Sequence, residues 1–364
     1  MTLVSIVLAA LGFMALVVFH EMGHFFAAKA VGMRVEKFSL FFPPNLFSRK
    51  RGETEYAIGA IPLGGYVKIT GMNPSEDLPD EVRTRAYYSQ PVWKRIVVIA
   101  AGPAVNLVLA FLLMFVFFAG IGAQTAPKEA KVDMVERAYP AAGELRPGDR
   151  IVAVDGRRGG VRALSRQISS HRCAERPPRP RCEAVEPAGL LIERSGRERR
   201  LALTPVYDPE AKKTRLGFGY VPGPRKTLPT GQAFSRTFDQ FTFIAGQTLS
   251  LPARLFDAQK RKEISGVVGS YEVTRQTILQ DIAEVVAILA VISLSLAIVN
   301  LFPFLPLDGG HIFWALVELV RRKPVSYQLM EKSSVIGFLL VIGLFVLGLS
   351  NDIGRLTGEG FQVR

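Results

Sequence analysis

The sequence is poor in cysteine and histidine. Among its 364 residues there are two cysteines and four histidines. Cys173 and Cys182 enclose eight residues, three of them prolines. A zinc site built on this pair lacks a fourth ligand, because His171 is the only further candidate nearby. The pair therefore predicts either a disulfide, which needs an oxidising compartment, or two free thiols.

Charge is missing from four long windows. Residues 3–20, 96–127, 285–307 and 333–351 contain no Asp, Glu, Lys or Arg. A helix needs roughly 20 apolar residues to cross a bilayer, so each window predicts a transmembrane span. The first window has no basic region before it and no small-residue cleavage site, and its apolar character continues to residue 33. It therefore predicts a retained span and not a signal peptide.

The unequal loops between the windows predict the domain organisation. Residues 1–127 would contain the first two spans and a polar loop, and residues 282–364 the last two spans. Residues 128–222 are long enough for a folded domain. Residues 223–281 mix aromatic and polar side chains, as expected of an amphipathic linker that rests on the membrane surface.

Basic residues in the short loops predict the orientation in the membrane. The loop at residues 34–95 carries ten Lys and Arg, and the connector at 322–332 carries Arg322, Lys323 and Lys332. The positive-inside rule places both loops in the cytoplasm and the 128–222 domain outside it. The net charge of +13 indicates attraction to the anionic head groups of the lipid bilayer. No accompanying motif indicates a nucleic-acid partner.

A metal-binding pattern lies at the end of the first window, in the run His20-Glu21-Met22-Gly23-His24. Two histidines four residues apart share one face of a helix and can share a zinc ion, while Glu21 is placed to act as a general base. Ionisable residues inside a span are costly unless they are ligated, paired or hydrated. The alternative is a span that ends near residue 19, with this run forming a solvated turn at the interface.

A catalytic zinc site needs a third protein ligand, and the third window suggests one. Pro303 and Pro306 break the predicted helix at membrane depth, which is tolerated where the backbone lines a cavity. Asp308 follows at once, beside two glycines that allow close approach of the backbone. Asp308 is the better third ligand. His311 could instead orient a ligand or cap the next helix.

These motifs together resemble the site-2 protease family. The matching pieces are the HExxH run and the N-x-x-P-x-x-P-L-D-G-G-H run from Asn300 to His311. The nearest resemblance is to the bacterial RseP-type enzymes of regulated intramembrane proteolysis. Residues 62–68 resemble the family's membrane-re-entrant β-hairpin, and residues 101–106 resemble its G-P-x-x-N segment.

The resemblance implies a role for each matching residue. It implies zinc bound by His20, His24 and Asp308, with Glu21 as the catalytic base. It also implies substrate-binding roles, which would fall on Asn300, Gly64, Gly65, Tyr66 and Asn106. Two simpler readings stay open: Gly64-Gly65 as an ordinary turn, and each asparagine as a hydrogen bond between membrane helices.

Residues 138–156 look like the core of a PDZ domain. A Pro-Gly-Asp turn leads into the alternating strand 151–154, which Asp155-Gly156 ends. A second strand pair is expected at 189–194 and 200–205, joined across Ser195-Gly196. A PDZ domain would capture an extended peptide at a sheet edge. The alternative is a β-rich spacer without a ligand.

The expected fold is thus a polytopic α-helical membrane protein with four transmembrane helices, a re-entrant β-hairpin and one extracytoplasmic PDZ-like domain. The expected function is zinc-dependent cleavage of transmembrane segments of pre-trimmed single-pass proteins, such as anti-sigma factors or signal-peptide remnants. The expected location is the bacterial inner membrane, with the active site toward the cytoplasm. Two rivals are a scaffold with structural zinc and a transporter. Against them, only three zinc ligands and no inverted repeat are found.

Overall fold

The computed structural model describes residues 2–73, 76–175, 177–208, 211–257, 261, 266–281 and 283–357. The chain divides into two compact units. One is formed by residues 2–121 together with 228–357, and the other by residues 122–227. The second unit begins six residues before and ends five residues after the domain predicted at 128–222.

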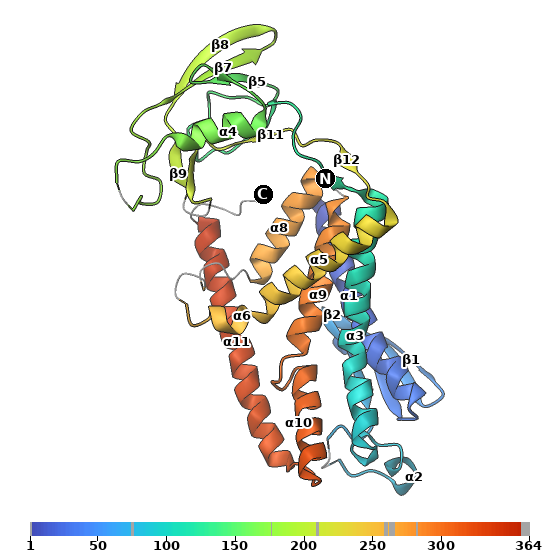
Figure 1. Cartoon of the computed structure of the whole chain (residues 1–364). Helices are drawn as coiled ribbons and strands as arrows, with labels where there is room; N and C mark the ends of the chain where they lie inside the picture. The colour runs from blue at the N-terminus through green and yellow to red at the C-terminus, as the bar shows by residue number, and fades with distance from the viewer. Residues whose placement is uncertain are drawn as a thin grey trace. The chain divides into compact units, whose positions relative to one another are not determined.

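The first unit is mainly helical, with one long hairpin (Figure 1). Its principal elements are α1 (Thr2–Ala30), β1 (Val35–Arg51), β2 (Thr54–Ile69), α2 (Asp80–Arg83), α3 (Val92–Val116), the π-helical turn η2 (Phe117–Ile121), α5 (Thr230–Leu249), α6 (Leu251–Arg254), α8 (Val267–Gln280), α9 (Glu284–Asn300), α10 (Asp308–Arg321) and α11 (Tyr327–Thr357).

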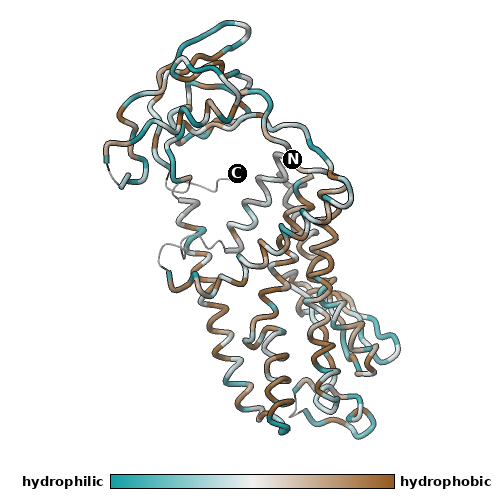
Figure 2. The backbone as a smooth tube through the Cα atoms, in the orientation of Figure 1, coloured by the Kyte–Doolittle hydropathy of each residue, from teal (hydrophilic) through white to brown (hydrophobic). Residues whose placement is uncertain are grey.

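Three helical stretches in the described part of the chain are long and apolar enough to cross a membrane. They are Ala10–Ala30, Val92–Ile121 and Gln328–Gly354, and Figure 2 shows apolar residues along most of α3 and α11. The third predicted span is shorter than expected. Helix α9 has 17 residues, or about 25 Å at 1.5 Å per residue, which is less than a bilayer core of about 30 Å. The chain leaves the helix after Asn300, just before the two prolines, as predicted.

Helix α3 is the centre of the first unit, because it packs against α1, α5, α9 and α10. The crossing with α1 is close. A Cβ added at Gly23 would lie 2.6 Å from the carbonyl oxygen of Ala101. Small residues at membrane helix crossings allow such an approach. Helix α5, predicted as part of an amphipathic linker, lies across α3 and α9 (Figure 1). Residues 264 and 265 of the linker lie outside the described residues.

The hairpin of β1 and β2 is larger than the predicted one. It begins at Val35, turns at Gly52 and returns to Ile69, with an irregular register. Residues 37–40 pair both with 55–58 and with 65–68, so the hairpin folds back on itself. Gly64 and Gly65 lie inside strand β2. The ordinary-turn reading of this pair is therefore wrong.

The second unit is β-rich with one helix, α4 (Val161–Ser170). Its sheet has the order β6-β5-β7-β8, and β4 pairs with β11. The bounds are β3 (Ala123–Gln124), β4 (Val132–Val135), β5 (Arg150–Val154), β6 (Arg157–Arg158), β7 (Ala188–Arg194), β8 (Arg197–Leu203), β9 (Val206–Asp208), β10 (Lys213–Arg215), β11 (Phe218–Tyr220) and β12 (Arg225–Lys226).

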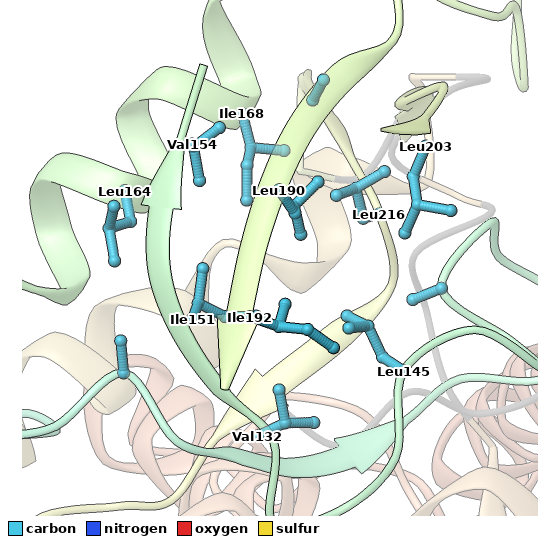
Figure 3. Packing of buried hydrophobic residues seen from close by; sticks show 13 residues of the cluster. Val132, Leu145, Ile151, Val154, Leu164, Ile168, Leu190, Ile192, Leu203 and Leu216 are labelled. Carbon is cyan, nitrogen blue, oxygen red and sulfur yellow. The ribbon is translucent and has the colours of Figure 1, made fainter. Parts of the chain in front are cut away.

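The core of this unit forms between the sheet and α4. Figure 3 shows Ile151 and Ile192 of the sheet in one cluster with Leu164 and Ile168 of the helix. Burying each such aliphatic side chain contributes roughly 1.5–3 kcal/mol before the cost of chain ordering. Side chains alternate between the two faces of a strand, so the apolar positions along 150–154 and 188–194, such as Ile151 and Ile192, lie on the face of the sheet that packs against α4.

Both predicted turns of this unit are confirmed. Asp155 and Gly156 have φ of 51° and 75°, and Ser195 and Gly196 have 52° and 75°. Positive φ at both central residues belongs to the type I′ hairpin turn. Strand β8 starts at residue 197 and not at 200, because the two-residue turn puts Arg197 opposite Arg194. The two cysteines form a disulfide, with Cα atoms 6.1 Å apart.

Candidate metal centre

Helix α1 carries the first half of the centre. It runs without a break through residues 20–24 and ends at Ala30. Two residues later, Gly32 adopts the left-handed φ of 84° that terminates the helix. Met33 N donates to Ala28 O and Gly32 N to Lys29 O, which is the Schellman arrangement that closes a helix. His20 and His24 are only 6% and 7% exposed. The solvated-turn alternative is therefore wrong.

Helix α10 carries the second half, because Asp308 is its first residue. The start of this helix lies tightly against the turn at residues 301–305. A Cβ at Gly309 would lie 2.2 Å from Leu301 O, and one at Gly310 would lie 2.4 Å from Leu305 N. Only glycine allows this approach, so the two glycines fix where the Asp308 carboxylate lies.

The three predicted ligand residues converge. His20 Nε2 lies 3.3 Å from His24 Nε2, and Asp308 Oδ2 lies 3.1 Å and 3.3 Å from these two nitrogens. Atoms that bind a tetrahedral zinc at about 2.0–2.1 Å lie roughly 3.3 Å from one another. The triangle therefore fits this ion.

The environment of Asp308 supports the same fit. Its Oδ2 is buried and has no hydrogen-bond partner among the described residues. In the described part of the chain, the three residues are also the only cluster of potential metal ligands. A closed structural zinc site needs four protein ligands, whereas a catalytic one keeps a position open. The arrangement is therefore of the catalytic kind, and this argues against the scaffold rival.

Helix α3 lies directly behind the cluster. Val98 O lies 2.9 Å from His24 Nδ1, so it accepts a hydrogen bond from that ring. Gly102 leaves room for the same ring, since a Cβ there would lie 2.2 Å from His24 Nε2. Metal-binding histidines commonly donate their second N–H to a carbonyl in this way. Sequence reasoning missed Val98, because a backbone carbonyl has no signature in residue type.

Glu21 lies between the cluster and strand β2. Its carboxylate is in hydrogen-bonding contact with the backbone of Val67. A Cβ at Gly65 would lie 3.2 Å from Glu21 Cγ. Residues 65–68 pair with β1 on one side, and no pairing of their other edge occurs among the described residues. An acid next to a metal cluster thus faces a strand that can accept a further strand.

Four further residues singled out in the sequence lie in different settings. Tyr66 stacks on Phe42, with ring centroids 6.0 Å apart and an angle of 14° between the rings. Asn106 is fully buried, and its Nδ2 lies 3.4 Å from His20 Nδ1. Asn300 is the half-buried last residue of α9, at the start of the turn that leads to Asp308. His311 is not in the metal cluster.

An ion pair that the sequence analysis did not identify anchors α10 on α3. Arg95 binds Glu318 through two hydrogen bonds, Nη1 to Oε2 at 3.0 Å and Nη2 to Oε1 at 2.6 Å. Both side chains are largely shielded, with 11% and 24% exposure. Glu318 is the only acid within α10 after Asp308, so an acid isolated in an apolar helix was the available clue.

Comparison with known proteins assigns the family. The profile described as Peptidase family M50 matches residues 8–344. A protein of Brucella suis biovar 1 is 32% identical over 96% of each chain. Proteins of Clostridium perfringens and Campylobacter jejuni are 30% and 29% identical, over 96% and 94% of this chain and 98% and 92% of theirs. All three are named "Putative zinc metalloprotease".

The chain belongs to peptidase family M50. This confirms the resemblance to site-2 proteases, the enzyme class of zinc metallopeptidase and zinc as the cofactor. The M50 chain also has helices apolar enough for a membrane protein and a separate β-rich unit, as expected for a membrane-embedded peptidase.

Proposed function

We propose that this M50 peptidase cleaves peptide bonds inside the transmembrane segments of single-pass proteins. The observation that carries the proposal is the position of the metal cluster. His20 and His24 lie within a helix of membrane-spanning length, at Ala10–Ala30. A substrate bond must reach that depth to be cut, so the substrate segment must itself lie in the membrane.

In this proposal His20, His24 and Asp308 hold the zinc ion. When bound, zinc supplies a Lewis acid that polarises the scissile carbonyl and lowers the pKa of water. Glu21 takes the proton from the attacking water and passes it to the leaving amine. The two imidazoles are buried from bulk water. Electrostatic interactions are stronger in such an environment of low dielectric constant.

Strand β2 is the proposed cradle for the substrate. A peptide bond in a helix is shielded by its own hydrogen bonds, so the substrate segment must unwind before it is cut. Gly64, Gly65 and Tyr66 would pair with it as an added strand, next to Glu21. Gly65 lets this strand lie close to the base, since an added Cβ would be 3.2 Å from Glu21 Cγ. Asn300, in the turn before Asp308, would donate to the developing oxyanion.

The wider arrangement follows from the sequence. Helix α9 would cross the membrane together with the turn at residues 301–307, giving four spans. The β-rich unit at 122–227 would be an extracytoplasmic PDZ-like domain that admits substrates already trimmed outside. Anti-sigma factors and signal-peptide remnants are the proposed substrates, in regulated intramembrane proteolysis at the bacterial inner membrane. The cluster would then open toward the cytoplasm, and products would leave inward.

The Glu21→Gln variant tests the chemistry. We expect purified full-length E21Q to retain one zinc per chain, measured by elemental analysis, and to leave a transmembrane model peptide intact. The matched control is Glu129→Gln, an exposed change in the second unit that should leave cleavage at the wild-type rate. Cleavage by E21Q at a rate close to wild type would refute the base role. Cleavage of only water-soluble peptides by the wild type would refute the intramembrane assignment.

A further inference from the structure

The second ring nitrogen of each histidine ligand must also be accounted for. A neutral imidazole carries its proton on one nitrogen and offers a lone pair on the other. For His24 the assignment is clear. The carbonyl oxygen of Val98 can only accept, so Nδ1 at 2.9 Å carries the proton and Nε2 offers its lone pair toward the cluster. His20 needs an equivalent acceptor at its own Nδ1.

The group at that nitrogen is the side chain of Asn106. Its Nδ2 lies 3.4 Å from His20 Nδ1. The side chain is fully buried, and its Oδ1 has no hydrogen-bond partner among the described residues. This orientation of the amide is unfavourable for two reasons. Its oxygen is buried without a hydrogen-bond partner, and its NH2 donor faces the N–H that a metal-binding His20 would carry on Nδ1.

A half-turn of the amide removes the contact between two donors and gives the oxygen a partner. The oxygen and nitrogen ends of an Asn amide have nearly the same size, so the exchange leaves the packing unchanged. Oδ1 then faces His20 Nδ1 and accepts its proton in a hydrogen bond. His20 Nε2, 3.1 Å from Asp308 Oδ2, keeps its lone pair for the metal.

We propose that Asn106 is the positioning residue for His20, acting through an Nδ1–H···Oδ1 hydrogen bond that selects the metal-binding tautomer. The inference deepens the proposed zinc site and rests on it. It also replaces the earlier expectation of substrate contact, because a side chain with no exposed surface is closed to substrate. Asn106 therefore acts through His20 and not on the reacting atoms.

One face of helix α3 supplies the groups that surround both histidines. Val98, Gly102 and Asn106 recur every four residues and so lie along one face of the helix. They supply a carbonyl for His24, space for its ring and an amide for His20. Ser293 of α9 donates to the main-chain oxygen of Asn106 at 2.9 Å, a contact in which the amide side chain takes no part.

The test compares substitutions that remove or keep the acceptor. Asn106→Leu has a similar volume and no polar atom, whereas Asn106→Asp keeps an acceptor. The matched control is Ser293→Ala, which removes a neighbouring buried hydrogen bond and leaves the amide in place. For each purified full-length chain, zinc affinity is measured by competition with a chelator, and the geometry is read from the visible absorption of the cobalt-substituted protein. Thermal unfolding of the metal-free chain reports folding.

We expect N106L to bind zinc about 10–100 times more weakly, as is usual when a ligand loses its orienting partner. N106D should stay within about threefold of wild type, because a carboxylate is also a common partner of a metal-bound histidine. S293A should match wild type. The cobalt spectrum should change in N106L alone. Asn106→Ala provides the same comparison should N106L fail to fold.

Two outcomes would overturn the role of Asn106: unchanged zinc affinity in the Leu and Ala variants, or N106D as weak as N106L. The His20→Ala and Asp308→Asn variants separate this from the proposed site. If both of them bind zinc normally, the site itself fails. If both lose zinc while N106L retains it, only the inference about Asn106 fails.

Discussion

A single methyl group at Gly102 gives the sharpest test of the geometry of the metal centre. Gly102 lies in α3 directly against the His24 ring. A Cβ there would lie 2.2 Å from Nε2, whereas ordinary contact begins near 3.4 Å. The imidazole or the helix must therefore shift by about 1.2 Å. Ligand distances to zinc tolerate only about 0.2 Å, so the displacement is about six times what the site allows.

We expect the Gly102→Ala variant to lose at least about 100-fold in zinc affinity, since the displaced atom is the ligand itself and not a supporting group. Cleavage should fall in parallel. The helix itself should not suffer, because Ala is favoured over Gly in a helix interior by about 0.5–1 kcal/mol. Chelator competition and cleavage of a transmembrane peptide, both on the full-length chain, measure the two effects.

Two other glycines, with no clash and with a smaller clash, provide comparisons for the expected loss of zinc affinity. Gly246 lies in α5 with nothing within 4 Å of an added Cβ, so Gly246→Ala is the matched control and should bind zinc normally. At Gly23 the Cβ would meet Ala101 O at 2.6 Å, and the required shift of about 0.8 Å predicts a smaller loss. A folded G102A chain with wild-type zinc affinity would show that zinc does not bind at this cluster.

Two further predictions concern ion pairs. Glu318→Gln should lower the stability of the solubilised chain by about 2 kcal/mol, as expected for a shielded charged hydrogen bond. Glu53 pairs with Arg85 through two hydrogen bonds in a more exposed setting, so Glu53→Gln should cost less than about 1 kcal/mol. Equal melting temperatures of the two variants would contradict this. In the second unit, the bidentate hydrogen bond from Arg194 lowers the pKa of the buried Asp149 carboxyl. The pair therefore stabilises the unit above the unfolded-state pKa of about 3.9, and this contribution is lost as the pH falls through the lowered value. The protection of the β7 amides against hydrogen exchange, measured relative to the intrinsic rate at each pH, should fall at acid pH in wild type and change less with pH in Asp149→Asn.

The transmembrane helices were largely predictable because their cause is local. A charge-free run satisfies its own backbone hydrogen bonds as a helix, and lipid favours no other open structure. The short length of α9 has a local cause too. The charge-free window runs to residue 307, but Pro303 and Pro306 lack an N–H, so the helix within it stops at Asn300 and is shorter than the window.

The convergence of His20, His24 and Asp308 was predictable for a different reason. The spacing of His20 and His24 fixes their shared face within one helix, and the broken third window drew attention to Asp308. The supporting groups could not be found in this way. Val98 contributes a main-chain atom, and the partner of Arg95 lies 223 residues away. The size of the β1–β2 hairpin was also missed, because its register is interrupted and no regular alternation marks its full length.

The centre has a consequence for assembly of the first unit. Helix α1 alone presents two imidazoles, and these can meet before the rest of the chain has folded. Asp308 arrives only when α10 has packed on α3, which requires the glycine contacts at the turn before it and the Arg95–Glu318 pair at its other end. Zinc that binds all three ligands therefore favours the assembled state over every earlier one, by an amount set by its affinity and concentration. A zinc ion held by the three proposed ligands would thus also hold together helices that lipid alone has little reason to bring into contact.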